Sequence, residues 1–153
     1  MKKSLLLLSS IIALSCSKND DNNSANNSIY GNWKLISVNG IAITDCEAQF
    51  PDLILNSNNI GNEGFGATLP NGNCIDDSRD IQFTLENNVL FVKEINTNPD
   101  NYIFETKRNI TSISNSELKL KIFYVRQSNP SGGVDVDNIP ASEQTEYLYT
   151  KSN

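Results

Sequence analysis

Residues 81–95 read IQFTLENNVLFVKEI, and this stretch decides the fold class. Apolar Ile81, Phe83 and Leu85 alternate with polar side chains, which is the two-residue period of a half-buried β-strand. Asn87-Asn88 then interrupts the alternation with two residues that tolerate the left-handed conformation of a tight turn. The alternation resumes after this pair, so the stretch predicts an antiparallel β-hairpin.

Strand signals of the same kind recur along the rest of the chain, whereas helical periodicity is nearly absent after residue 28. We predict strands at Gly31–Val38, Leu53–Leu55, Ile60–Thr68, Ile81–Glu86, Val89–Ile95, Tyr102–Ile113, Leu118–Tyr124 and Glu143–Lys151. Sequential antiparallel strands joined by short turns lose their unpaired edges when the sheet closes on itself. The sequence therefore predicts an all-β fold, an eight-stranded antiparallel up-and-down β-barrel. A barrel of this size is filled by its own side chains or holds one small ligand.

The first and third strands carry additional local signals. Trp33, Leu35 and Ser37 are expected on one face of the first strand, and Asn39-Gly40 is a turn signal that ends it. Three glycines within Ile60–Thr68 predict bulges or a tight bend in the third strand.

The second half of the chain contains one long segment without a clear strand pattern. The sixth strand is expected to pass through a bulge, and the seventh has one apolar face that runs from Leu118 to Tyr124. Gln127–Ser142 is polar and contains two prolines and two glycines, which predicts a loop. Loops longer than about 12–15 residues are often lids or binding loops. We therefore expect this loop to cover the mouth of the barrel.

The N-terminal residues have the layout of an export signal. Lys2 and Lys3 give a positively charged start, and Leu5–Leu14 is an apolar run interrupted by two serines. A membrane-spanning helix needs roughly 20 apolar residues, so this shorter run predicts a cleaved signal peptide over residues 1–15. The cysteine that follows, Cys16, is incidental if the signal is an ordinary secretory one.

Ala13-Leu14-Ser15-Cys16 resembles the lipobox of bacterial lipoproteins, in which the cysteine receives diacylglycerol and becomes the first mature residue. The resemblance implies a lipid anchor at Cys16, because two or more acyl chains hold a protein stably in a membrane. Ser17–Asp21 resembles the signal that sends some gram-negative lipoproteins to the outer face of the outer membrane, although it is equally the start of a soluble tether. Asn19–Ser28 is nearly all Asn, Asp and Ser, so residues 16–28 are predicted to be a flexible tether.

Size and charge limit what the remaining residues, 29–153, can do. They are 125 of the 153 residues, which fits one compact domain. For the predicted mature protein, residues 16–153, removing Lys2 and Lys3 from the 12 basic residues leaves 10 against 18 acidic ones, a net charge of −8. Because the Lys and Arg residues are also scattered, nucleic acid is disfavoured as a partner. Attachment to anionic lipid through surface charge is disfavoured for the same reason, which leaves attachment to the lipid anchor.

Two cysteines remain once Cys16 is assigned to lipid. Cys46 and Cys74 then form an even pair in an exported, oxidising setting, which predicts a disulfide. The closed loop would span 28 positions, for which the chain-entropy estimate is roughly 3–4 kcal/mol of stabilisation. The alternative is a metal or redox pair, but the spacing is not a CxxC and the chain has no histidine to complete a zinc site.

Gly31-Asn32-Trp33 at the start of the first strand resembles the Gly-x-Trp motif of the lipocalin fold. A cysteine follows the first turn, then come a glycine-rich strand, a second cysteine and the segment Thr111–Leu120. In this order the features resemble the short lipocalin-like lipoproteins of gram-negative bacteria, over nearly all of residues 29–151. The resemblance implies that Trp33 plugs the closed end of a barrel. It also implies a cavity for a small hydrophobic or amphipathic ligand.

The residue inventory argues against catalysis. The chain has no histidine, which excludes Ser-His, Cys-His and His-metal chemistry. Two acidic groups remain, at Asp76–Asp80 and Asp135–Asn138, and we interpret both as solvated loop residues. Calcium needs about six to eight oxygen ligands, and the second group lacks the glycine and distal glutamate of an EF-hand loop. We predict no metal site, no cofactor and no enzymatic activity, with a carboxylate-dependent enzyme as the weaker alternative.

The aromatic residues at alternating strand positions are explained first of all by filling of the core. The alternative is a barrel pocket lined partly by tyrosines, which binds a ligand and orients it with a few polar groups. The candidate lining residues are Phe83, Phe91, Tyr102, Phe104, Tyr124, Tyr147 and Tyr149. Our leading hypothesis is a monomeric, membrane-anchored binding module. Its rival is a surface-exposed structural or protein-interaction lipoprotein whose barrel is filled by side chains.

Overall fold

The computed structural model describes residues 29–43, 46, 52–95, 102–129 and 132–152. The predicted signal peptide, Cys16 and the tether lie outside these residues. The described strands are β1 (Gly31–Val38), β2 (Ile41–Ala42), β3 (Leu53–Leu55), β4 (Ile60–Thr68), β5 (Cys74–Glu86), β6 (Val89–Glu94), β7 (Phe104–Ile113), β8 (Glu117–Ser128), β9 (Val134–Asn138) and β10 (Glu146–Ser152). All of their pairings are antiparallel, and no α-helix occurs in the described part of the chain.

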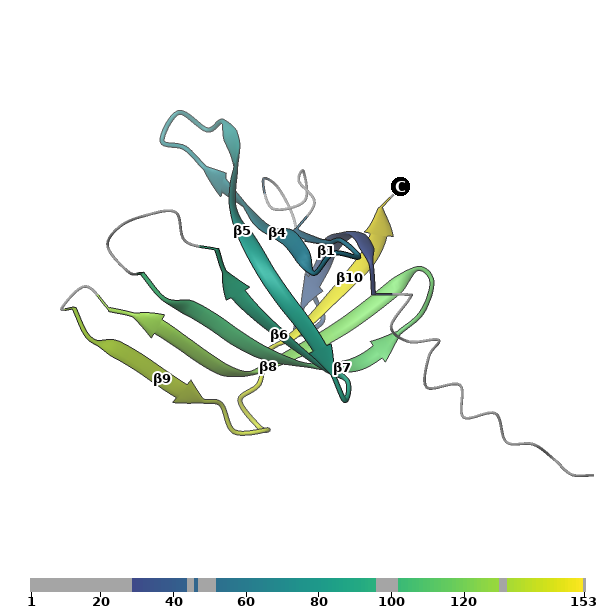
Figure 1. The fold of residues 1–153 in the computed structure, drawn as a ribbon. Helices are drawn as coiled ribbons and strands as arrows, with labels where there is room; N and C mark the ends of the chain where they lie inside the picture. The colour runs from purple at the N-terminus through teal and green to yellow at the C-terminus, as the bar shows by residue number, and fades with distance from the viewer. Residues whose placement is uncertain (1–28, 44–45, 47–51, 96–101, 130–131, 153) are drawn as a thin grey trace, which may run out of the picture.

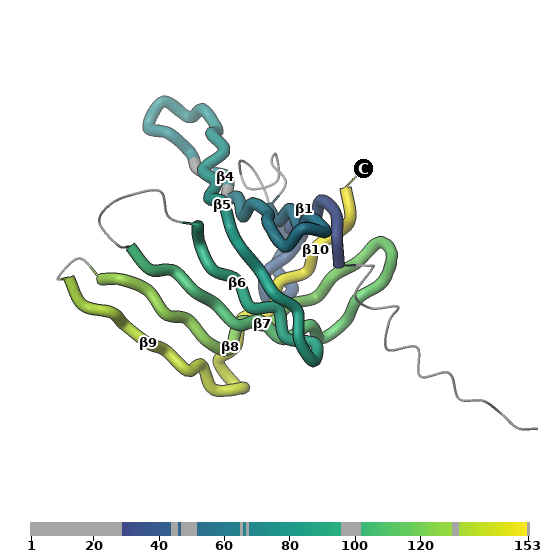
Figure 2. The backbone as a smooth tube through the Cα atoms, viewed as in Figure 1, coloured from purple at the N-terminus to yellow at the C-terminus, as the bar shows by residue number. Residues whose placement is uncertain are grey.

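The strands form one sheet that closes on itself (Figure 1). The order around the ring is β1, β3, β4, β5, β6, β7, β8 and β10, and β10 pairs with both β8 and β1. β2 and β9 are additional short strands that pair with β1 and β8. The predicted all-β, eight-stranded antiparallel barrel is therefore confirmed, and its eight strands are those predicted from the sequence. The β4–β5 hairpin extends beyond the rest of the barrel (Figure 2).

The barrel has two different halves along its axis, because β8 has two successive partners on one edge. Glu117–Lys121 of β8 pairs with β10, whereas Tyr124–Ser128 pairs with β9. We call the half in which β10 joins β8 to β1 the closed half. The half in which β9 lies beside β8 is the open half, and no described pairing joins β9 to β10, β1 or β2.

The hydrophobic core fills the closed half. Its buried members are Ile29, Trp33, Leu53, Leu55, Ile81, Phe83, Leu90, Val92, Leu118, Leu120 and Tyr149. Trp33 is fully buried, and its Nε1 donates a hydrogen bond to the carbonyl oxygen of Ile29 over 2.7 Å. Burying a tryptophan without such a partner would leave its N–H unsatisfied. This bond also fixes the first described residue of the chain at the closed end of the barrel.

Gly31 has a specific steric role next to this tryptophan. Its φ is +137°, and a Cβ at this position would lie 2.6 Å from Cε of Lys151. Real Cβ atoms do not approach another carbon this closely, so a side chain at residue 31 would displace the lysine. With glycine present, the Lys151 ammonium lies 5.1 Å from the Trp33 ring centroid, within the range of a cation–π contact.

Two predicted turns have the expected backbone. Asn87 and Asn88 have φ values of +50° and +62°, and the hairpin from Ile81 to Glu94 pairs without a register shift. Asn39 and Gly40 likewise have φ values of +49° and +77° between β1 and β2. Two successive residues at positive φ are what a type I′ hairpin turn requires. Both turn predictions are confirmed.

Local register corrects two expectations in the first strands. The pairing of β1 with β10 shifts between Leu35 and Ser37, which reverses the alternation, so Val38 and not Ser37 points into the barrel with Leu35. The predicted bulge in the glycine-rich strand is absent from its pairing with β5, which is regular throughout β4. Position 61 requires glycine for a different reason: a Cβ there would overlap the carbonyl oxygen of Ile54 in the neighbouring strand. The bulge expected in β7 does occur, at two points of its pairing with β8.

The predicted loop at Gln127–Ser142 is wrong for Gln127–Ser128 and for Val134–Asn138, which are strands. β8 continues to Ser128, and Val134–Asn138 returns beside it as β9. Prolines on both sides of this short strand and two glycines before it obscured its Val-Asp-Val-Asp alternation. The acidic residues of β5 before Ile81 were also read as a loop, but they pair along β4.

The predicted disulfide between Cys46 and Cys74 is confirmed. The two Cα atoms are 5.2 Å apart, and the bond closes a loop across 28 sequence positions. Cys46 is buried, and its sulfur accepts a hydrogen bond from the Thr68 hydroxyl over 3.0 Å. The disulfide joins the segment between β2 and β3 to the start of β5, at the last β4–β5 pair before the hairpin turn.

Candidate functional site

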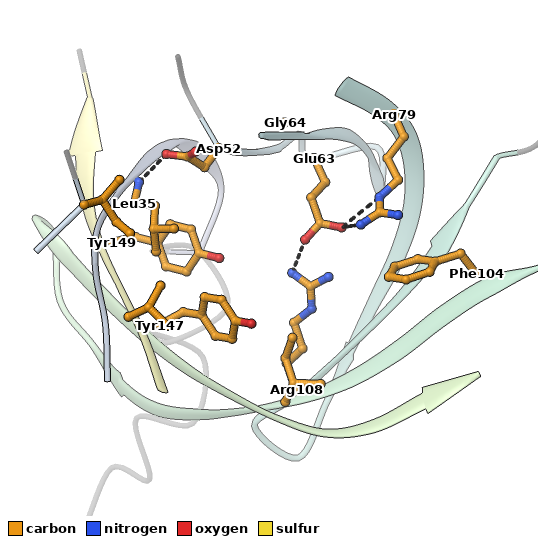
Figure 3. Close-up of a pocket in the computed structure, with 12 residues that line it drawn as sticks. Leu35, Asp52, Glu63, Gly64, Arg79, Phe104, Arg108, Tyr147 and Tyr149 are labelled. Carbon is orange, nitrogen blue, oxygen red and sulfur yellow. Dashed lines mark hydrogen bonds and ion pairs between the residues drawn. The ribbon is translucent and has the colours of Figure 1, made fainter. Parts of the chain in front are cut away.

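The open half of the barrel contains a cavity of about 370 Å³ (Figure 3). The lining residues come from β1, β4, β5, β7, β8 and β10 and from two segments next to β2 and β3. They are Leu35, Val38, Ile43, Asp52, Glu63, Gly64, Arg79, Phe104, Arg108, Ile122, Tyr147 and Tyr149. Ligand pockets in proteins usually measure about 300–1,000 Å³. The cavity has the size of a site for one small molecule.

One wall of the cavity is an ion cluster centred on Glu63 of β4. One oxygen of Glu63, Oε1, lies 2.6 Å from Nη1 of Arg108, whose side chain is only 2% exposed. The other oxygen, Oε2, lies 3.1 Å from Nη2 and 3.2 Å from Nε of Arg79. A single carboxylate therefore bridges two guanidinium groups, as the dashed lines in Figure 3 show.

Both arginines have further partners that fix their positions. Nε of Arg108 donates to the Thr106 hydroxyl over 2.9 Å, and both residues are buried. The guanidinium of Arg79 lies 3.7 Å from the Phe104 ring centroid and 3.8 Å from a carboxylate oxygen of Glu94. Burying a charge is tolerated only when it is paired and hydrogen-bonded. The cluster meets this requirement on every side.

The ion pairs control the protonation state of the cluster. Burial acts most strongly on Glu63 and by itself would raise its pKa, but Arg108 and Arg79 together outweigh burial and lower the pKa below 4.5. Burial likewise would lower the pKa of Arg108, and the Glu63 carboxylate more than compensates, so this pKa is raised. Both groups are therefore charged at neutral pH.

The opposite wall carries two tyrosines of β10 and a buried aspartate. Figure 3 shows the side chains of Tyr147 and Tyr149 pointing into the cavity from the side facing Glu63 and Arg108. Asp52 is 5% exposed, and its carboxylate accepts a hydrogen bond from the backbone N–H of Leu35. Burial above all raises the pKa of Tyr149, so its hydroxyl keeps its proton throughout the physiological range.

Three of the seven predicted pocket residues line this cavity, namely Phe104, Tyr147 and Tyr149. Phe83 lies in the hydrophobic core of the closed half, where it is 1% exposed. Tyr102 is 43% exposed and precedes β7. These two predictions are wrong because alternation identifies the face of a strand but not the level along the barrel axis.

Phe91 and Tyr124 lie on the outer face of the barrel and were also wrongly predicted. Phe91 faces the outside with Lys107 and Phe123, in a shallow depression of about 630 Å³. The ammonium of Lys107 lies 4.8 Å from the Tyr124 ring centroid. The register of β7 with β8 shifts between Lys107 and Arg108, and this shift turns Tyr124 away from the interior side of Ile122.

The charged residues of the cavity were missed by sequence reasoning. Phe104, Thr106 and Arg108 follow one another at two-residue spacing in β7, so the alternation itself placed Arg108 on the interior face. A charged residue in an inward register is a usable signal for a polar pocket. Glu63 offered no comparable signal, because it lies among glycines in the sequence.

No family model, no curated protein and no solved structure matches this chain. In the described ranges no group of three or more His, Cys, Asp or Glu side chains is arranged to hold a metal ion. The same residues include no helix with the length and hydropathy needed to cross a bilayer. The candidate site is therefore defined by its own geometry, as a mainly apolar cavity with a satisfied ion cluster on one wall and two tyrosines on the other.

Proposed function

We propose that the protein is a membrane-anchored, lipocalin-like binding module without enzymatic activity. The observation that carries this proposal is the cavity of about 370 Å³ in the open half of a barrel whose closed half is tightly filled. A rigid apolar base below a chamber with a few oriented polar groups is the usual construction of a small-molecule site. The ligand would be a small hydrophobic or amphipathic molecule.

The anchor proposal rests on the N-terminal sequence and on where the barrel begins. The apolar run Leu5–Leu14 ends just before Cys16, as in bacterial lipoproteins of the outer membrane. Ile29, the first described residue, packs against Trp33 at the closed end. A lipid at Cys16 would therefore be joined to the closed end of the barrel through the predicted tether of residues 17–28. Whether the protein faces the periplasm or the cell surface depends on the segment Ser17–Asp21.

Gly31 and Trp33 support the lipocalin-like part of the proposal. Trp33 fills the closed end of the barrel, and Gly31 leaves space for the lysine that covers its ring. This arrangement agrees with the role that the Gly-x-Trp resemblance implies for a plugging tryptophan.

Two alternatives are less well supported. A structural or protein-interaction lipoprotein with a filled barrel would not need a cavity in the open half. A carboxylate-dependent enzyme would need a carboxyl group in the cavity with a raised pKa, able to give and take a proton near neutral pH. The Glu63 pKa is instead lowered by its two arginines.

Native mass spectrometry of the protein extracted gently from its own membranes tests the binding function. We expect a fraction of the protein to carry one additional small molecule. Ile122→Trp, which fills the cavity, should abolish this additional mass. Val136→Trp on β9, where residue 136 is 54% exposed, is the matched control and should retain it. Absence of any retained ligand, together with no binding of added amphipathic probes, would refute the proposal.

Membrane fractionation tests the anchor separately. Cys16→Ala should move the protein from the membrane fraction to the soluble fraction, with an unchanged β-sheet circular dichroism spectrum. If the Cys16→Ala protein stays in the membrane fraction, the lipid-anchor proposal is wrong, whereas the binding proposal is unaffected.

A further inference from the structure

The cavity has no excess charge of either sign among its lining residues. Arg79 and Arg108 supply two positive charges, and Asp52 and Glu63 supply two negative ones. Both arginines already contact Glu63, and Arg79 also lies near Glu94. An ionic ligand would therefore enter without a free counter-ion and would lose its hydration shell. This argues for an uncharged ligand.

The tyrosine wall has hydrogen-bonding capacity that the protein does not use. Neither the Tyr147 hydroxyl nor the Tyr149 hydroxyl has a hydrogen-bond partner among the described residues. Tyr149 is only 5% exposed, and both side chains point into the cavity (Figure 3). No buried side-chain oxygen or nitrogen of the described residues lacks a partner, so both hydroxyls are accessible from the cavity space and free to bond what occupies it. The missing partner is the feature that a ligand oxygen would supply.

Apolar side chains line much of the same cavity. Leu35 and Val38 come from β1, Ile43 follows β2, and Ile122 comes from β8. Phe104 adds one aromatic face, although Arg79 already stacks on that ring. The space near the tyrosines therefore suits a hydrocarbon body that carries one polar atom.

The raised pKa of Tyr149 shows that this part of the cavity disfavours a negative charge. Burial is the main reason that its pKa is raised, and Glu63 and Asp52 raise it further, against the opposing effect of Arg108. The same burial and the same two carboxylates would act against a carboxylate ligand bonded to this hydroxyl. The surroundings of Tyr149 thus favour a neutral ligand, independently of the balance of charges in the cavity.

We propose that the pocket binds an uncharged amphipathic molecule whose hydroxyl or carbonyl oxygen is hydrogen-bonded to Tyr147 and Tyr149. Its hydrocarbon part lies against Leu35, Val38 and Ile122. This inference rests on the proposed binding function and narrows it to one ligand class, with the ion cluster acting as a neutral wall and not as an anion site.

Calorimetric titration of the full chain with three eight-carbon probes tests the ligand class. The probes are octan-1-ol, octanoate and octylammonium, at pH 7 and with the same detergent without protein as the blank. We expect octan-1-ol to bind at least about tenfold more tightly than either ion. Equal or tighter binding of octanoate would overturn the inference and leave the binding function standing. If none of the probes binds, and no molecule is retained in the native mass spectrum, the proposed function itself fails.

Tyrosine variants test the hydrogen bonds. The double variant Tyr147→Phe with Tyr149→Phe removes only two hydroxyls, so we expect the fold to be retained and octan-1-ol to bind about tenfold more weakly. Tyr124→Phe removes a hydroxyl from the outer face and is the matched control, with no expected change. The single variants Tyr147→Phe and Tyr149→Phe serve as the readout if the double variant fails to fold. Unchanged octan-1-ol binding in the folded variants would overturn the assignment of the tyrosines.

Discussion

The closed and open halves of the barrel share strands β4 and β5, but these strands contribute different chemistry to each half. In β5, Ile81 and Phe83 point into the apolar core, whereas Arg79, one step further along the same face, points into the cavity. In β4, Glu63 occupies the interior position beyond Gly61. The change from apolar to charged occurs within one inward-facing row of side chains. Along β4 and β5 the two halves therefore differ in side-chain chemistry, in addition to the different partners of β8.

Because of this difference, we assign stability to the closed half and recognition to the open half. Fully burying a large apolar side chain stabilises a fold by about 1.5–3 kcal/mol, and the closed half does this at nearly every inward position. A buried ion pair contributes little net stability, because desolvation offsets most of the attraction. We infer that the closed half stabilises the barrel, and that the open half retains charges that keep its interior polar and incompletely filled.

Removing the central carboxylate of the cluster should have the largest effect. Glu63→Gln leaves Arg108 buried without a counter-ion, and we expect a loss of about 3–5 kcal/mol in the free energy of unfolding. Urea denaturation measures this loss. The control is Glu63→Leu combined with Arg108→Met, which removes both charges and should recover most of the stability. A double variant as unstable as Glu63→Gln would mean that the ion pair itself supplies stability.

Breaking the disulfide should weaken the barrel without changing the core. Cys46→Ser combined with Cys74→Ser opens a loop of 28 positions, for which we expect a loss of about 3–4 kcal/mol. The near-ultraviolet circular dichroism signal of Trp33 should be unchanged under native conditions, since the disulfide does not contact the closed end. Loss of this signal would show that the native structure of the closed half also depends on the disulfide.

Two leucine truncations compare the halves directly. Leu118→Ala, in the filled core, should cost about 3 kcal/mol because it creates a new cavity. Leu35→Ala should cost about 1–2 kcal/mol, because this side chain already borders a cavity and loses fewer contacts. Thermal denaturation of both variants provides the measurement. Equal losses would indicate that the open half is packed as densely as the closed half.

Acidification should produce the smallest and most gradual change. Because the pKa of folded Glu63 is lowered, its contribution to stability is fully present above the ordinary value of 4.5 and is lost as the pH falls through the folded pKa. The unfolding free energy of the wild type should therefore decline below about pH 4.5, more steeply than that of Glu63→Gln. If the unfolding free energies of the wild type and of Glu63→Gln decline equally with falling pH, protonation of Glu63 does not cause the loss of stability.

The sequence was sufficient to predict the barrel. Alternation in residues 81–95, the Asn87-Asn88 turn and the two cysteines each depend on local chemistry, and the structure confirms all three. The tyrosines of β10 were predicted for the same reason, since inward alternation is a local property.

Two physical causes explain the errors at Val38, Tyr124 and Glu63. A single register shift reverses which face a side chain occupies, which moved Val38 into the barrel and Tyr124 out of it. Pairing across distant strands is the second cause, because Glu63 meets Arg108 only after β4 and β7 have both entered the ring. The composition of these strands indicates neither the register shifts nor the contact between Glu63 and Arg108. Arg108 alone carried a readable signal, through its inward register.

The two successive partners of β8 have a consequence for how the barrel opens. β9 is attached to the ring through β8 alone among the described pairings, whereas β10 is held by β8 and β1 together. The amide protons of β9 that take part in the pairing with Tyr124–Ser128 can therefore exchange with solvent when the β8–β9 pairing alone opens. Those of β10 exchange only when the ring itself breaks, so β9 forms an independent opening unit beside the cavity.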